Sequence, residues 1–434
     1  MDSPKGSYVL ATFEGGGSVA PFITLARKLV ANGHTVRIVS DECNRREALA
    51  TGGTFSPWKR APNRPTRDRD DDPVREWEAE GPAAAVKFLG GQVFGPALDH
   101  AHDIIDILRE HPADLVVAND MVCGAMMGCE AIGQPFVAMS CNPIVFPVID
   151  GMPPLGPGFP PAVTAEDKAL HAEVRAGLTA MIDAWLPDYN AQRAELGLPA
   201  LDHLSDQLYA ARRVLLATSP AFDFAPETLP DLFTYVGPQL GDNLWSQPWA
   251  SPFAPDDARP LVLVAFSTTF QDHAGQLQAV IDALAQLDVR AIATLGGGVR
   301  AGEVNGAANV HVVDSAPHGE LLPLARLVVT HGGHGTVIKA ATAGLPQLII
   351  PHGRDQADNG IRIAHRGAGI VLPRGSDSDT IRAAVETLLA DPAYAEAAQA
   401  LGRRIREGYD PDAVVRELER IAATSSCAAR EKVA

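Results

Sequence analysis

Hydrophobic and polar positions follow one another in blocks along this chain, and the blocks predict strands and helices in turn. Short apolar runs bounded by glycine, proline or polar residues are typical of strands buried in a parallel sheet. Between them, apolar residues recur at helical spacing, as at Phe22, Leu25 and Leu29. We therefore expect parallel sheets with right-handed crossovers, with strands at 7–13, 35–40, 114–118, 135–140, 214–218, 233–236, 261–266, 290–295, 310–313, 327–330, 347–350 and 370–372.

The alternation is interrupted once, at residues 237–259, which are rich in Gly, Pro and Asp and show no periodicity. Such a segment is typical of a linker between domains. We expect one α/β domain at 1–236, a second at 260–410, and a last segment at 411–434. The length of 434 residues suits two domains, and the cleft between two domains is a favoured place for a small-molecule site.

Composition narrows the class of protein. The hydrophobic content of 46% and charged content of 21% are ordinary for a soluble globular protein. A formal net charge of −17 argues against nucleic acid or an anionic membrane as the main partner. The five cysteines form no C-x-x-C pair, which favours free thiols in a reducing cytoplasm. The apolar run 8–13 is too short for a signal peptide, and no stretch is long enough to span a bilayer.

The clearest candidate chemistry lies in residues 328–359. A buried strand ends at Thr330, breaks into a glycine-rich turn at 331–336, and continues as a helix to about Ala343. Backbone N–H groups and the positive end of the helix dipole make such a turn a phosphate or diphosphate site. Asp355 and Gln356 follow the next strand at the same edge of the sheet. Together they predict a sugar nucleotide, with Asp355 and Gln356 holding the sugar hydroxyls.

Three motifs resemble the nucleotide-sugar signature of UDP-glycosyltransferases with the GT-B fold. They are the HGGxGT turn at 331–336, the Gly344-Leu345-Pro346 corner and the P-x-x-x-D-Q-x-x-N run at 351–359. The nearest resemblance is to bacterial enzymes that decorate small natural products such as antibiotics. It implies an α/β GT-B fold, that is, two facing Rossmann-like domains with parallel sheets and an interdomain cleft. It also implies that the last helix, at about 411–423, crosses back to the first domain.

The resemblance assigns roles in the second domain, with two departures. Gly333, Gly335 and Thr336 would cradle the diphosphate and His331 would contact it; Thr268 would face the phosphates or the sugar, although a helix cap explains it nearly as well. Base binding would rest on the backbone near Ala316, because the usual stacking tryptophan is replaced by Ser315. Lys339 stands where the family commonly has a ribose-binding glutamate, and a lysine cannot accept a hydrogen bond.

The catalytic base is the larger question. Many relatives carry a histidine in a G-H-x-x-P turn after the first strand, whereas this chain has Gly17-Ser18-Val19-Ala20-Pro21. A serine hydroxyl is not a base near neutral pH unless another group activates it. Asp120 is the best remaining candidate because it ends a strand at the same edge, although the family aspartate could align with Asn119. Glu14 is a second candidate, and Ser18 could position the acceptor.

Two irregular stretches of the first domain have alternative explanations. The charged segment 55–80 is either a solvated loop or a lid that contacts the acceptor. The proline-rich apolar segment 141–162 either packs on its own domain or lines an apolar acceptor pocket beside Ser18 and Asp120.

The sequence thus predicts a cytoplasmic, inverting glycosyltransferase that moves a hexose or deoxyhexose from a UDP- or dTDP-sugar to a small, largely apolar acceptor. Its partners are this donor and acceptor. No cofactor and no metal are implied, because no D-x-D pair is placed as a diphosphate–metal clamp: Asp68-Arg69-Asp70 fits the string but lies in a charged loop far from the donor motif. The alternatives are a sugar-nucleotide epimerase of the same fold, or a catalytically silent homologue that acts as a partner protein. The sequence does not decide between a monomer and a homodimer.

Overall fold

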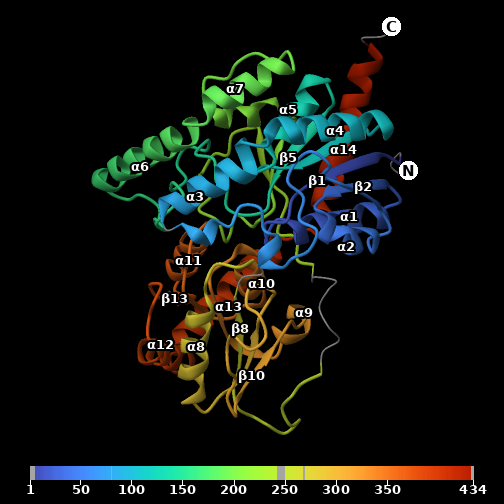
Figure 1. Ribbon diagram of the computed structural model, residues 1–434. Helices are drawn as coiled ribbons and strands as arrows, with labels where there is room; N and C mark the ends of the chain where they lie inside the picture. The colour runs from blue at the N-terminus through green and yellow to red at the C-terminus, as the bar shows by residue number, and fades with distance from the viewer. Residues whose placement is uncertain (1–4, 80, 242–249, 267–268, 432–434) are drawn as a thin grey trace.

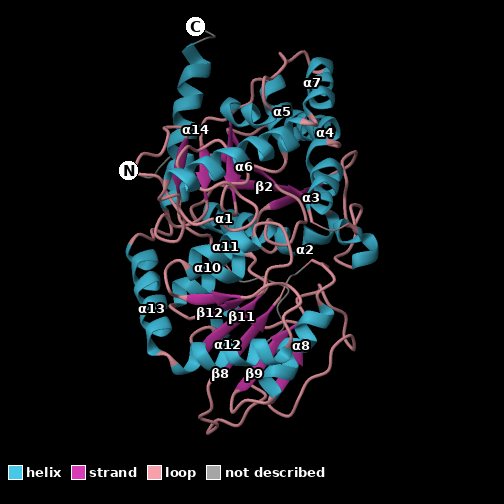
Figure 2. Ribbon diagram, turned by 90° about the vertical axis from the view of Figure 1, so that its left-hand side faces the viewer, coloured by secondary structure: helices cyan, strands magenta, loops and turns pink. Residues whose placement is uncertain are grey.

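The computed structural model describes residues 5–79, 81–241, 250–266 and 269–431, with side chains described to residue 424. These residues form two α/β domains, one above the other in Figure 1, each built on one parallel sheet with helices on both faces. In Figure 2 the two sheets lie in separate halves of the molecule. The described parts of the expected linker, 237–241 and 250–259, carry neither helix nor strand.

The first sheet has seven strands in the order β3-β2-β1-β4-β5-β6-β7. The order reverses beside β1, which pairs with both β2 and β4, so a crevice opens at the carboxyl ends of these strands. Its elements are β1 (Ser7–Ala11), β2 (Thr35–Ser40), β3 (Thr54–Pro57), β4 (Leu115–Asn119), β5 (Phe136–Ser140), β6 (Val214–Leu216) and β7 (Phe233–Tyr235), with helices α1 (Val19–Ala31), α2 (Arg45–Leu49), α3 (Pro82–Phe88), α4 (Ala97–Glu110), α5 (Cys123–Ala131), α6 (Ala165–Asp183) and α7 (Leu186–Glu195).

The second sheet has six strands in the order β10-β9-β8-β11-β12-β13, with its reversal at β8 and β11. Its elements are β8 (Leu261–Ala265), β9 (Arg290–Thr294), β10 (Val310–Val313), β11 (Ala325–Thr330), β12 (Gln347–Ile349) and β13 (Gly369–Val371), with helices α8 (Ala274–Ala285), α9 (His318–Leu321), α10 (His334–Ala343), α11 (Gln356–Ala364), α12 (Ser378–Ala390) and α13 (Pro392–Glu407).

Alternating residues of the central strands pack into separate buried clusters on the two faces of each sheet. In β1, Val9 and Ala11 belong to one buried cluster and Tyr8 and Leu10 to the cluster on the opposite face. Both faces are covered, so the strand is apolar throughout, as a parallel strand must be.

The last helix, α14 (Ala413–Glu431), returns to the first domain (Figure 1). Its Val414, Leu418 and Ile421 are buried in the same cluster as residues of α1. Glu419 Oε1 lies 3.0 Å from His34 Nε2. The helix continues to Glu431, beyond the end expected near residue 423. Among the described residues, no helix is both long enough and apolar enough to cross a membrane.

The two irregular stretches of the first domain are both ordered against other parts of the chain. Segment 55–80 begins with part of the edge strand β3, and its Asp68 and Asp70 meet Arg300 of the second domain at 2.6 and 2.8 Å. The segment is therefore docked on the second domain, although Asp68 and Asp70 are themselves exposed. In segment 141–162, Phe146 and Ile149 are buried in the core of their own domain.

Candidate functional site

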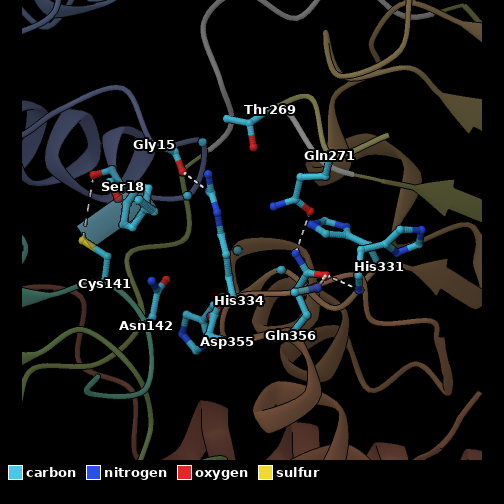
Figure 3. A pocket seen from close by; sticks show the side chains of 18 of the residues that line it. Gly15, Ser18, Cys141, Asn142, Thr269, Gln271, His331, His334, Asp355 and Gln356 are labelled. Atoms are coloured by element: carbon cyan, nitrogen blue, oxygen red, sulfur yellow. Dashed lines mark hydrogen bonds between the residues drawn. The ribbon is translucent and has the colours of Figure 1, made fainter. Parts of the chain in front are cut away.

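One cavity of about 970 Å³ lies between the two domains. Its wall includes Ser18 and Asn142 from the first domain, and His331, Asp355 and Gln356 from the second (Figure 3). The first-domain residues follow β1 and β5, and the second-domain residues follow β11 and β12. The carboxyl edges of both sheets therefore face one space, which is where ligands bind in open parallel sheets.

At Gly332 and Gly333 the turn between β11 and α10 leaves no room for a Cβ. Gly332 has φ +99, and a Cβ there would lie 2.8 Å from the Gln356 carbonyl oxygen. A Cβ at Gly333 would lie 2.6 Å from His331 Nε2, so the imidazole is pressed against the turn. At Gly335 a Cβ would meet open space. The turn places His331 and the first N–H groups of α10 at one point, which suits an anion.

Three imidazoles gather around Phe266 beside this turn. The ring centroids of His273, His331 and His352 lie 5.7, 6.1 and 5.8 Å from that of Phe266. Burial lowers the pKa of His331 well below its usual value, and the neighbouring His273 lowers it further. Burial likewise lowers the pKa of His273 to about 3 and that of His352 to about 4. Without a ligand the cluster is thus neutral near pH 7, and a bound anion would raise these pKa values again.

Asp355 and Gln356 lie side by side but differ in how far they are already bonded. Asp355 Oδ2 accepts from Asn359 Nδ2 at 2.8 Å, and the same amide donates to the Gly332 carbonyl at 3.0 Å. Gln356 Oε1 accepts from the backbone N–H groups of His352 and Gly353 at 2.7 and 3.1 Å. Gln356 therefore shapes its own loop through its oxygen, while Asp355 is the freer acceptor for a hydroxyl.

The other predicted donor residues fall as follows. Ala316 and Thr336 line the cavity together with Gly333, Gly335 and His331. Lys339 and Ser315, at which the sequence departs from the family, line it too. Thr268 lies outside the described residues. The roles of all these residues stay predictions, but those that are described share one wall.

The turn after β1 brings Ser18 to the cavity, whereas Glu14 is engaged elsewhere. Ser18 caps α1 without a side-chain hydrogen bond, and its carbonyl accepts from Cys141 Sγ at 3.9 Å. Glu14 Oε2 accepts from Arg67 Nε at 3.1 Å and Oε1 from the Gly16 N–H at 3.0 Å. Both carboxylate oxygens therefore stabilise the turn, and Glu14 is not among the described residues that line the cavity.

Asp120 lies behind the wall of the cavity. It is only 3% exposed, and its Oδ2 has no hydrogen-bond partner among the described residues. Burial raises its pKa to about 6, partly offset by a hydrogen bond from Ser140. The neighbouring Met121 lines the cavity, and Asp120 is not among the described lining residues. A buried acid with one unpartnered carboxylate oxygen and a raised pKa is a candidate for proton transfer, but the geometry offers no direct contact with an acceptor.

The rest of the first-domain wall is apolar. It combines the end of β1, the helices α3 and α6 and the proline-rich segment, through Phe13, Phe88, Leu89, Val145, Leu155, Leu178 and Met181. Segment 141–162 thus has both of its expected roles, because some of its apolar residues pack inward and others face the cavity. An apolar wall with few polar groups suits a hydrophobic ligand.

Four residues of the site were not predicted from the sequence: Asn142, Gln271, Arg354 and Glu76 line the cavity as well. Asn142 and Gln271 follow strands, and position after a strand was the signal available for both. Nothing in the sequence pattern linked Glu76 to Arg354, whose ion pair joins the two domains.

The chain is similar to known proteins along most of its length. Residues 278–421 match the family described as "Erythromycin biosynthesis protein CIII-like, C-terminal domain". The chain is 28% identical to 4'-demethylrebeccamycin synthase of Lentzea aerocolonigenes over 426 residues, which are 94% of this chain and 96% of that protein.

Two solved structures share the fold along the chain. The glycosyltransferase of kitacinnamycin has a TM-score of 0.72 and 22% identity, with 96% of this chain and 99% of that one covered. The glycosyltransferase VinC, solved in complex with dTDP, has a TM-score of 0.66 and 20% identity, with 96% and 100% covered.

Proposed function

Since the chain is a glycosyltransferase of the GT-B fold, similar along its length to enzymes of natural-product pathways, we propose that the transfer inverts the configuration at the anomeric carbon of the sugar. The donor is a dTDP- or UDP-linked hexose or deoxyhexose, and the acceptor is a small, largely apolar aglycone. The observation that supports this most directly is the single cavity in which the turn at 331–336 and the carboxylate of Asp355 face the apolar first-domain wall.

The donor side supports a nucleoside diphosphate. The glycine turn, the N-terminus of α10 and the imidazoles of His331 and His352 line one part of the cavity. Because a diphosphate accumulates charge as it leaves, N–H donors already aimed at it favour the transition state over the bound donor. VinC was solved with dTDP, and Lys339 replaces the glutamate expected to bind a ribose, so dTDP-sugars are the first donors to test.

The proposed step is a single displacement. The acceptor oxygen attacks the anomeric carbon from the face opposite the nucleotide, the bond to the phosphate oxygen breaks, and the acceptor proton passes to a base. Inversion follows from attack on the opposite face. Of the residues predicted as base, we propose Asp120, because Glu14 is held by Arg67 and Ser18 is not basic. Since Asp120 lies behind the cavity wall, it takes up the proton through an intervening group and not by direct contact with the acceptor. The reaction needs no bound cofactor beyond the donor.

The test incubates the purified protein with dTDP-glucose or UDP-glucose and a panel of aromatic and polyketide aglycones. Nucleotide release is followed with and without acceptor, and the anomeric configuration of the product is read from NMR couplings. Acceptor-dependent release with an inverted product is expected. A donor whose sugar is epimerised would support the epimerase, and donor binding without turnover would support the silent homologue. A product with retained configuration would exclude the single displacement.

A further inference from the structure

The described residues contain three non-glycine positions with left-handed backbone, and each is next in sequence to Glu76, contacts its side chain, or is next in sequence to a residue that contacts it. Arg75 (φ 49) precedes Glu76. Asp272 (φ 53) follows Gln271, whose Nε2 lies 3.5 Å from Glu76 Oε1. Arg354 (φ 53) pairs with Glu76 directly. Left-handed backbone is costly for such residues and persists where the surroundings impose it, often at functional sites.

Arg354 crosses from the second domain to the first. It lies between β12 and α11, immediately before Asp355. Its Nε and Nη2 lie 2.8 and 2.6 Å from Glu76 Oε1. Its Nη1 donates to the Gly15 carbonyl at 2.9 Å, a hydrogen bond drawn in Figure 3. The guanidinium also lies 5.2 Å from the ring centroid of Phe88.

These contacts connect the turn beside the proposed acceptor pocket with the loop proposed to hold the donor sugar. Gly15 belongs to the turn that presents Ser18 to the cavity, and Asp355 is the carboxylate proposed to hold the sugar. Glu76, the counter-ion, lines the cavity and is only 9% exposed. The side chain of Arg354 is 27% exposed, but a guanidinium paired with a buried carboxylate and bonded to a carbonyl has little freedom, because its planar shape fixes both directions at once.

Arg300 also makes ion pairs between segment 55–80 and the second domain, at a more exposed position than that of Arg354. Arg300 meets Asp68 and Asp70, and its side chain is 43% exposed. Arg300 is not among the described residues that line the cavity. Exposed pairs of this kind contribute little to stability, so Arg300 provides a matched control for a cationic contact between the same domains.

We propose that Arg354 is a positioning residue that holds the Gly15–Ser18 turn in register with the Asp355–Gln356 loop, with Glu76 fixing its direction. The proposal rests on the proposed function. It assigns Arg354 no contact with the reacting atoms. Its effect is to keep acceptor oxygen and anomeric carbon in line, since a displacement of about 1 Å at a reacting centre can cost on the order of a hundredfold in rate.

The first test compares Arg354→Lys with Arg300→Lys in the full chain. Lysine keeps the charge but cannot reach Glu76 and Gly15 together. We expect Arg354→Lys to lower kcat about 10- to 100-fold, to change dTDP affinity in calorimetry less than threefold, and to raise the ratio of donor hydrolysis to transfer. Arg300→Lys should leave all three within twofold. A kcat within twofold of the wild type in Arg354→Lys, or equal losses in the two variants, would overturn the proposal.

A second measurement does not need turnover. Hydrogen–deuterium exchange of the peptide containing Gly15–Ser18 should be faster in Arg354→Lys and in Glu76→Gln, and unchanged in Arg300→Lys. If the wild-type protein transfers no sugar but the exchange pattern holds, the proposed function fails and the positioning contact stands. If the exchange of this turn is the same in all variants, the contact does not position it, whatever the activity.

Discussion

The two walls of the cavity, one from each domain, differ in polarity. On the second-domain wall, the proposed donor wall, polar groups are joined by directed hydrogen bonds: Gln356 bonds its own loop, and Asn359 bonds both Gly332 and Asp355. On the acceptor wall, most of the surface is apolar, from side chains such as Phe88 and Leu178. Directed polar networks are costly to disturb because each change leaves a buried group unpaired. Apolar walls tolerate changes of shape. We therefore expect narrow donor and broad acceptor selectivity.

Within the proposed donor wall, the largest effect should follow a change of the carboxylate proposed to bind the sugar. Asp355→Asn keeps the volume but removes the charged acceptor, and hydrogen bonds to charged groups contribute about 1.5–3 kcal/mol. We expect kcat/KM for the donor to fall roughly 10- to 100-fold, with dTDP affinity little changed because dTDP carries no sugar at this position. Asp379→Asn, whose side chain is 77% exposed on α12, is the control. Equal activity of Asp355→Asn and wild type would remove Asp355 from the donor wall.

The next effect tests the glycine turn. In Gly333→Ala the new Cβ would meet His331 Nε2 at 2.6 Å, so the imidazole must move from the cradle. We expect dTDP to bind roughly tenfold more weakly, equivalent to about 1.4 kcal/mol, as measured by calorimetry. Gly275→Ala, where a Cβ would meet nothing within 4 Å, should bind dTDP as the wild type does. Unchanged affinity in Gly333→Ala would mean that the diphosphate does not depend on His331.

The central strands and the glycine turn at 331–336 could be predicted because each is marked by a pattern of neighbouring residues. Buried parallel strands are continuous apolar runs, and β2 and β10 have the bounds expected for them. β3 was missed because it is a short edge strand with Pro57, in which only Phe55 is buried. The Arg354–Glu76 pair joins residues 278 positions apart, and only the docking of the domains brings them together. For Asp120 the strand end was predicted, but the direction of the side chain depends on packing that the pattern does not encode.

Asp120 tests the contrast between the polar and the apolar wall. If it is the base, the reaction depends on a polar group that lies behind the apolar wall. If it is the base, Asp120→Asn should lower kcat by at least 100-fold, within the usual range for a general base, with dTDP affinity unchanged. A kcat within twofold would exclude it.

The same variant should change stability in the opposite direction. Burial raises the folded-state pKa of Asp120 from 3.8 to about 6, so the ionised carboxylate destabilises the fold above pH 6 and has no such effect below about pH 4. Two pKa units correspond to roughly 3 kcal/mol, less any cost of an unpaired amide. Asp120→Asn should therefore have a higher Tm than the wild type at pH 8, and the difference should shrink as the pH falls from 6 to 4. A Tm difference independent of pH would contradict the raised pKa.

The smallest effect should come from the acceptor wall. Leu178 lies on α6 and lines the cavity, and Leu178→Ala enlarges the apolar pocket without unpairing a polar group. The loss of apolar contact with the ligand is worth roughly 1–3 kcal/mol at most, and a bulkier aglycone can refill the space. We expect KM for a small aglycone to rise several-fold, KM for a larger one to stay equal or fall, and dTDP affinity to be unchanged. Leu170→Ala, at a 45% exposed position of the same helix, is the control. Equal changes for small and large aglycones would show that α6 does not shape the acceptor pocket, and the contrast between the two walls would then rest on the donor side alone.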